Sequence, residues 1–256
     1  LDYAVRLKMM QNLAEETLTH RHDSRASAVP VRQYGSFQPG TGTGGAGEHW
    51  GAISYRFPEE IFRLNTHLKE RHAGNKLISD VTAGDWGVSY DDLEPYYWKS
   101  ELMMGVCGKA GNLKGQKIEG GNIFEEPRQN EYPNPPHKDA YVPLVFRKAA
   151  IESGYHPYPV PTATLSRDYK NPDGVSRAGC AYCGMCTRFG CMIGAKAQPT
   201  NTLLPLLTGK KKFSLEAHAQ VRRVLHKDGK ATGVQYTDAK GQEFEQPAGV
   251  VVLASW

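Results

Sequence analysis

The sequence lacks the features that build a membrane protein or an exported precursor. It has no run of about 18 apolar residues, so no segment is expected to span a bilayer. Its first twenty residues lack the basic end, apolar centre and small-residue cleavage site of a signal peptide. Their apolar positions have near-helical spacing instead, which predicts an amphipathic helix. These positions are Val5, Met9, Leu13 and Leu18.

Strong charge of one sign is also absent. The formal net charge is +4, from 31 Lys and Arg against 27 Asp and Glu, and the basic residues are scattered. The one dense group, Lys210-Lys211-Lys212, has no aromatic residues interleaved with it, which favours a solvated turn over a nucleic-acid patch. We therefore expect no nucleic-acid partner.

No internal repeat is visible, and 27 Gly with 16 Pro indicate a loop-rich globular chain of one large or two small domains. A long glycine-rich loop is expected over residues 22–51, and an irregular excursion over 105–136. Ser89 and Asp92 form a capping-box pattern that opens a helix, which Pro95 is expected to bend or restart. Two further helices are expected over 58–72 and 141–153, the second ending at Gly154.

The last fifty residues change character. Apolar and polar residues alternate, and Asp228-Gly229 and Lys240-Gly241 are turn signals, so the pattern predicts a β-meander. The final run, residues 250–254, is continuously apolar and is typical of a strand buried on both faces of a parallel sheet. Because a domain rarely stops at such a strand, we expect the chain to be a piece of a larger protein.

Cysteine is scarce except in one place. Four of the five cysteines lie within twelve residues, at the spacing C-x2-C-x2-C-x4-C: Cys180, Cys183, Cys186 and Cys191. This spacing comes close to that of bacterial ferredoxins and favours an iron-sulfur site. Disulfides or free thiols remain an alternative, and so does zinc, although zinc more often uses two separated pairs. Cys107 lies far away and is interpreted as a buried thiol.

An iron-sulfur centre carries electrons, so a second group should supply them, and a flavin does this chemistry. The stretch GTGTGGAGEHWGAISYRF, residues 40–57, is where a flavin could lie. Consecutive glycines let backbone N–H groups approach a phosphate or a ring, while His49 and Trp50 add a polar group and an apolar wall. Glycine-rich loops are common, however, and this one lacks the strand and helix context of a dinucleotide-binding turn.

The chain as a whole resembles the glucose-methanol-choline oxidoreductases, in particular the flavoprotein subunits of gluconate 2-dehydrogenase and related sugar or sugar-acid dehydrogenases. The resemblance runs in order along essentially the whole chain. It is carried by YAVRLKMMQNLAEETLTHR, GSFQPGTGTGGAGEHWGAISYRF, DWGVSYDDLEPYY, GKAGNLKGQ, GGNIFEEPR, EYPNPPHK, CAYCGMCTRFGC and KATGVQYTDAKGQEFEQPA.

The resemblance implies an α/β fold, in which a doubly wound, Rossmann-like FAD-binding domain is interrupted by part of a substrate domain. The implied divisions are residues 1–57 and 201–256 for the FAD-binding domain, 58–178 for the substrate or cap region, and 179–200 for the cysteine-rich loop. The family's G-x-G-x-x-G strand and its active-site His match no position here, so we expect this piece alone to be inactive.

The resemblance also implies site residues. The loop over the flavin ring corresponds to Gly44, Gly45, Gly47, His49 and Trp50, and Gly51 replaces an Asn that relatives usually carry. Val221 matches a position whose backbone contacts the adenine.

Relatives with a cysteine-rich loop are associated with a three-iron cluster, for which Cys183, Cys186 and Cys191 are the first choice and Cys180 the uncertain fourth. The implied reaction is hydride transfer from a sugar or aldonic acid to FAD. Electrons then pass through the cluster to a cytochrome c subunit, in a periplasmic, membrane-associated complex that also has a small subunit.

Other functions stay open. The chain could be a non-catalytic electron-transfer or metal-binding module, or a truncated pseudoenzyme that only binds a partner. His137, the pair Glu125-Glu126 and the pair Asp91-Asp92 are interpreted as a turn cap, solvated residues and helix-start charges, without a catalytic role.

Overall fold

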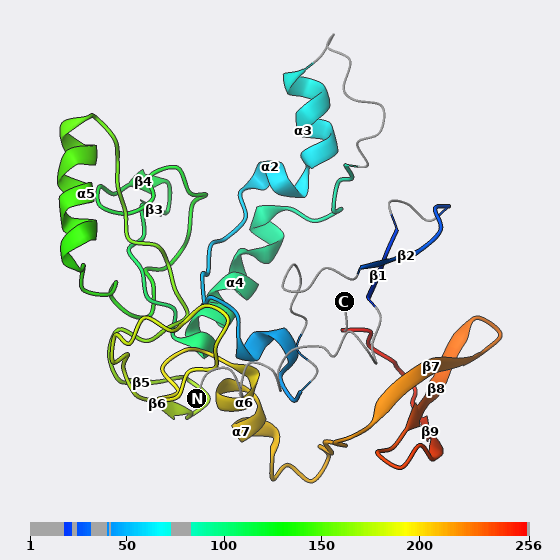
Figure 1. The fold of residues 1–256 in the computed structure, drawn as a ribbon. Coiled ribbons are helices and arrows are strands. Elements are labelled where there is room, and N and C mark those ends of the chain that lie inside the picture. Colours follow the sequence, from blue (N-terminus) through cyan, green and yellow to red (C-terminus); the bar gives the residue numbers. More distant parts are fainter. Residues whose placement is uncertain (1–17, 22–24, 32–39, 41, 73–82, 255–256) are drawn as a thin grey trace. The chain divides into compact units, whose positions relative to one another are not determined.

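The computed structural model describes residues 18–21, 25–31, 40, 42–72 and 83–254 (Figure 1). The helical elements are η1 (Gly45–Glu48), α2 (Glu59–Phe62), α3 (Leu64–Arg71), α4 (Tyr90–Met104), α5 (Tyr141–Glu152), α6 (Pro199–Thr202) and α7 (Leu204–Leu207). The strands are β1 (Leu18–His20), β2 (Val29–Val31), β3 (Asn112–Leu113), β4 (Gln116–Lys117), β5 (Tyr169–Lys170), β6 (Ser176–Arg177), β7 (Gln220–Lys227), β8 (Lys230–Thr237) and β9 (Glu243–Pro247). No helix of this described part is long and apolar enough to cross a membrane.

The chain divides into two compact units. The first contains the described residues from 46 to 206, and the second contains those from 207 onward together with those up to 45. All strand pairs in the described ranges are antiparallel: β1-β2, β3-β4, β5-β6 and the three-stranded order β7-β8-β9. Helices and sheets are both present, which agrees with an α/β protein, while the parallel sheet of a doubly wound domain stays a prediction.

The capping box at the start of α4 is confirmed. The backbone N–H of Asp92 donates to Ser89 Oγ over 3.2 Å, and the Ser89 N–H donates to the Asp92 carboxylate over 2.9 Å. These bonds satisfy two of the N–H groups that a helix start leaves unpaired. Pro95 was expected to bend or restart this helix, and the restart is wrong, because α4 runs through Pro95 as one helix. It ends at Met104 and is capped by Gly105, whose φ is 67°.

Two other helical predictions are confirmed with changed bounds. The helix expected over 58–72 is divided into α2 and α3, with Arg63 between them. The helix expected over 141–153 is α5, and Gly154 follows it with a φ of 78°, as a left-handed cap requires. The excursion at 105–136 contains only the two-residue strands β3 and β4, in agreement with its predicted irregularity.

The predicted β-meander is confirmed as β7-β8-β9, with turns at Asp228-Gly229 and Lys240-Gly241. The prediction of a buried strand over 250–254 is wrong. These residues form no strand, and the exposed fractions of Val250 and Val252 are 79% and 80%. A central parallel strand needs a hydrogen-bonded neighbour on each side. No described segment pairs with these residues.

The amphipathic helix expected near the start falls mostly on residues 1–17, which lie outside the described residues. Its last apolar position, Leu18, belongs instead to β1, where it pairs with Val31 of β2. The same pairing places a strand inside the long loop expected over 22–51.

The core of the first unit is small, and buried polar groups complete it. Its apolar cluster is Ala52, Val106, Tyr132, Ala163 and Ala197. Cys107 is buried as predicted, and its sulfur accepts the Ser166 N–H over 3.0 Å. Because small apolar side chains bury little area, we expect buried polar contacts to define the packing of this unit.

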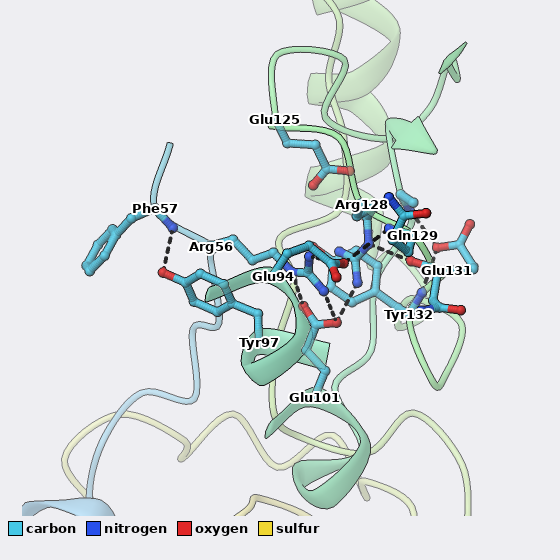
Figure 2. Close-up of polar contacts among 12 residues, drawn as sticks. Arg56, Phe57, Glu94, Tyr97, Glu101, Glu125, Arg128, Gln129, Glu131 and Tyr132 are labelled. Carbon is cyan, nitrogen blue, oxygen red and sulfur yellow. Dashed lines mark hydrogen bonds and ion pairs between the residues drawn. The ribbon is translucent and has the colours of Figure 1, made fainter. Parts of the chain in front are cut away.

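An ion cluster holds α4 against the segments that flank it (Figure 2). Glu101 of α4 accepts two hydrogen bonds from Arg56, over 2.8 and 2.9 Å, and one from Arg128 over 2.5 Å. All three side chains are nearly inaccessible, with exposures of 5% or less. Burial opposes the charge on Arg56, but its bonds to Glu101 and Tyr90 outweigh this effect and raise its pKa.

The expectation that Glu125 is solvated is wrong. Its carboxylate is half-buried and accepts the N–H groups of Gly111 and Asn112, over 2.7 and 3.3 Å. Glu126 is also engaged, since it accepts the Glu59 N–H over 3.0 Å. Both carboxylates therefore bind backbone N–H groups and support the irregular excursion, instead of facing each other as an acid and base pair.

Glu125 predicts a pH dependence of stability. Burial raises its pKa, against the opposing hydrogen bond from Gly111. The pKa of Glu125 is therefore higher in the folded protein than in the unfolded chain. Its contribution to stability is fully present below the unfolded pKa of about 4.3, and this contribution is lost as the pH rises through the folded pKa. We expect the stability of wild type relative to Glu125→Gln to decrease from pH 4 to pH 7. Urea unfolding of both proteins measures this, with Glu60→Gln, an exposed carboxyl, as control. A relative stability that increases over the same range would contradict the prediction.

Candidate functional site

The glycine-rich segment predicted to cover a flavin is sharply turned. Gly44 and Gly45 have φ values of 90° and 55°, a conformation that glycine adopts without strain. They lie in the second unit, whereas Gly47, His49 and Trp50 lie in the first. A Cβ on Gly47 would lie 2.8 Å from the ring of Pro199, so only glycine fits against the start of α6.

Glu48 and Trp50 attach this segment to the chain around α6. Glu48 accepts hydrogen bonds from the Gln198 amide over 2.8 Å and from the Thr200 hydroxyl over 2.9 Å. The Trp50 indole N–H donates to the Ala197 carbonyl over 2.8 Å, and the ring packs on the apolar cluster. The Trp50 indole nitrogen is thus committed to the protein, and the apolar wall predicted from this ring for a flavin stays a prediction. His49 is buried, at 8% exposure.

The same segment contacts the cysteine loop, residues 180–191. The Arg188 N–H donates to the His49 carbonyl over 2.9 Å. A Cβ on Gly51 would come within 3.2 Å of the Thr187 hydroxyl. Two segments about 135 residues apart in sequence therefore lie side by side, and the residue pattern of each predicts a redox role.

The cysteine loop has an unusual backbone. Tyr182 and Arg188 have φ values of 57° and 71°, and Gly184 has 77°; Gly194, just after the loop, has 72°. Left-handed residues other than glycine are strained, and such strain gathers at functional sites. All four clustered cysteines are free thiols, and Cys183 is exposed.

The thiols influence one another electrostatically. Burial raises the pKa of Cys186, and its neighbours Cys180, Cys183 and Cys191 raise it further. A donor set of four thiols on one loop suits an iron-sulfur cluster or zinc. As arranged here they do not fit one, since no group of three or more ligand side chains among the described residues is placed to hold a metal.

The FAD contacts predicted for the glycine-rich segment and for Val221 stay predictions. Gly44 and Gly45 carry no side chain in this turn, and the Gly45 N–H donates to the Gly42 carbonyl over 2.9 Å, so an approach of a ring or phosphate to these glycines stays a prediction. Val221 lies in β7, opposite Tyr236 of β8 at a register irregularity, and belongs to the second unit. The adenine contact predicted for its backbone stays a prediction.

A cavity of about 740 Å³ borders the cysteine loop. Cys180, Tyr182 and Cys186 line one side, and His137 and Phe146 lie among its other walls. His137 is more than a turn cap, because its Nε2 lies 2.7 Å from the Thr164 carbonyl oxygen and its ring packs edge-on against Tyr182. The cavity gives a ligand or a partner side chain a route to the thiols.

The sequence patterns did not indicate Lys196. Its side chain is fully buried, and its Nζ donates to the carbonyls of Trp50, Cys186 and Phe189. Burial lowers the pKa of Lys196. A single lysine among 31 basic residues leaves no signal of burial in one sequence, so only the structure could find it.

Comparison with known proteins shows which family the chain belongs to. The chain is 40% identical over its full length to the gluconate 2-dehydrogenase flavoprotein of Pantoea cypripedii, and spans 42% of that protein. It is 32% identical over half its length to the fructose dehydrogenase large subunit of Gluconobacter japonicus, of which it covers 20%. It is 28% identical over 67% of its length to a 2-methyl-1,2-propanediol dehydrogenase from Mycolicibacterium austroafricanum, of which it covers 28%. Residues 81–256 match the GMC oxidoreductase family, and the chain belongs to that family.

Proposed function

We propose that this chain is part of the flavoprotein of a dehydrogenase that oxidises a CH–OH group of a sugar or aldonic acid. Its family membership supports an FAD-dependent oxidoreductase. The full-length similarity to a gluconate 2-dehydrogenase flavoprotein and the similarity to a fructose dehydrogenase large subunit support the substrate class. In this proposal, FAD accepts the hydride, within a doubly wound domain that part of a substrate domain interrupts.

One observation carries the proposal. The segment that resembles the flavin cover is hydrogen-bonded to the cysteine loop through Arg188 and His49, and Lys196 donates to both segments. A flavin under the first segment would therefore lie close to the thiols. Such closeness is what a protein needs if it exports electrons through a second centre instead of giving them to oxygen.

We propose that the second centre is an iron-sulfur cluster of the three-iron type, held by Cys183, Cys186 and Cys191, with Cys180 as a further candidate. Assembly would require the thiols to converge from their positions here. The surface position of the loop and its glycines would allow that movement.

The partners and location follow from the same proposal. A cytochrome c subunit would accept the electrons, a small subunit would complete the complex, and the complex would lie in the periplasm at the inner membrane. The similarity to the 6'''-hydroxyparomomycin C oxidase of Streptomyces lividus, at 29% identity over 82% of the chain, supports the alternative that oxygen is the acceptor.

The test uses the intact protein, purified without oxygen. We expect a flavin absorbance band near about 450 nm, and an electron paramagnetic resonance signal of an oxidised three-iron cluster. The signal should be absent from Cys183→Ser, Cys186→Ser and Cys191→Ser, and retained in Cys107→Ser, because the Cys107 thiol is buried and bonded to the Thr164 carbonyl and the Ser166 N–H. Cys180→Ser then decides whether the fourth thiol is a ligand.

Substrate turnover separates the acceptors. Gluconate or fructose should reduce the flavin, and an artificial one-electron dye should reoxidise it faster than oxygen does. Iron-free, colourless protein would contradict the dehydrogenase proposal. Flavin without iron, combined with fast reaction with oxygen, would favour the oxidase.

A further inference from the structure

Lys196 is a fully enclosed cation whose ammonium group is bonded to three backbone carbonyls. Its side chain has no exposed surface, and its ammonium group donates over 2.8 Å to Trp50 O, 2.8 Å to Cys186 O and 2.6 Å to Phe189 O. An ammonium group has three donors, and here all three are used. Removing such a group from water is costly unless each donor is satisfied, so the geometry around Lys196 is specific.

The three acceptors come from two segments. Trp50 belongs to the segment that resembles the flavin cover, while Cys186 and Phe189 belong to the cysteine loop. The loop is held at two points by the same cation, on either side of Arg188. Lys196 thus connects the segment around Trp50 directly to the cysteine loop, which neither α4 nor the ion cluster at Glu101 does.

The backbone of Lys196 is itself anchored. Residue 196 pairs with Thr164 in an antiparallel bridge, and its carbonyl accepts the Asn201 amide over 2.9 Å. Its N–H lies 3.5 Å from the Cys191 sulfur, at the end of the cysteine loop. A side chain that extends from an anchored backbone to two loops can set their spacing.

We propose that Lys196 is a positioning residue, which holds the flavin-covering segment and the cysteine loop at a fixed spacing. This inference rests on the proposed function, because the spacing matters for electron transfer only if a flavin and a redox centre occupy the two segments. The positioning itself needs neither group, since it acts through backbone carbonyls of this chain.

The test compares Lys196→Met with a matched control, Arg177→Met, in the intact protein. Arg177 is also a buried cation that donates to backbone carbonyls, those of Ala195 and Met104, but it does not donate to the cysteine loop. Without the ammonium group, the loop should open locally. We expect alkylation of Cys186 and tryptic cleavage after the exposed Arg188 to accelerate roughly tenfold or more in Lys196→Met, and far less in Arg177→Met.

Alkylation is measured both as purified and after iron is removed with a chelator, so that a bound cluster does not mask the thiols. Equal acceleration in the two methionine variants would show a general loss of stability and would overturn the proposal, as would an unchanged rate in Lys196→Met. If Lys196→Met does not accumulate as folded protein, the uncharged and polar pair Lys196→Gln against Arg177→Gln makes the same comparison.

Two further readouts distinguish positioning from packing. Lys196→Arg keeps the charge and donors, so its loop should open more slowly than that of Lys196→Met, and equal rates would overturn the proposal. The flavin spectrum should shift in Lys196→Met and remain unchanged in Arg177→Met, because only Lys196 bonds the Trp50 carbonyl. Protein without flavin would contradict the proposed function, while the alkylation rates would still decide the role of Lys196.

Discussion

Glu101→Gln should lower the free energy of unfolding by about 3–5 kcal/mol, the cost of breaking a buried ion pair by removing one partner. Glu101 is the carboxylate that Arg56 and Arg128 share. Arg56 keeps a bond to Glu94 over 3.0 Å, but Arg128 would keep only its bond to Asn130 O and its contact with the Tyr132 ring. The Nη1 of Arg128 already has no hydrogen-bond partner among the described residues. Chemical denaturation of the intact protein measures the loss.

The control is a pair of the same type on the surface. Arg63 and Glu70 lie 3.6 Å apart with 53% and 66% of their side chains exposed, so Glu70→Gln should change stability by less than about 1 kcal/mol. Adding Arg128→Met to Glu101→Gln should recover part of the loss, because it removes the charge left without a carboxylate. Similar losses from Glu70→Gln and Glu101→Gln would show that burial of the cluster is not what stabilises it.

Gly111→Ala should be nearly as damaging, with a loss of about 3 kcal/mol or more from overpacking against a backbone that has no flexible end to move. A Cβ on Gly111 would lie 2.1 Å from the carbonyl carbon of Asn122. The opposing glycine shows the same crowding, since a Cβ on Gly121 would lie 2.3 Å from the Ala110 carbonyl oxygen. The backbone segments around Gly111 and Gly121 cross here with no side chain between them.

Gly84→Ala is the matched control for Gly111→Ala. A Cβ on Gly84 meets no atom within 4 Å, and its backbone is not left-handed. Alanine there should leave stability within about 0.5 kcal/mol or raise it slightly, because it restricts the unfolded chain. Thermal and urea unfolding of both variants measure the difference. A Gly111→Ala protein as stable as Gly84→Ala would mean that the crossing relaxes easily.

Local patterns in the sequence predicted local structure well. The Ser89-Asp92 capping box, the cap at Gly154 and the meander turns are confirmed, because each depends on neighbours within a few residues. Family membership was also readable, since it rests on many ordered matches along the chain. The fold class is confirmed only as a mixture of helices and sheets.

The failures share one physical cause. Residues 250–254 looked like a buried strand, but a strand needs partners that their own pattern cannot supply. Glu125 looked solvated, but the fold places two backbone N–H groups against its carboxylate. Pro95 was expected to bend or restart the helix, and no restart occurs. One missing hydrogen bond is tolerated there, because Glu94 and Glu101, on either side of Pro95, both bind Arg56.

The sequence by itself determined the family, the turn and cap chemistry, and the presence of four thiols on one short loop. Only the tertiary structure decided that the glycine-rich segment lies against this loop, that Lys196 bonds both, and that Glu101 joins two arginines. The physical reason is that these contacts join residues up to about 145 positions apart, and each side chain is ordinary in its own neighbourhood. A buried lysine differs from a surface lysine only in what the rest of the chain brings to it.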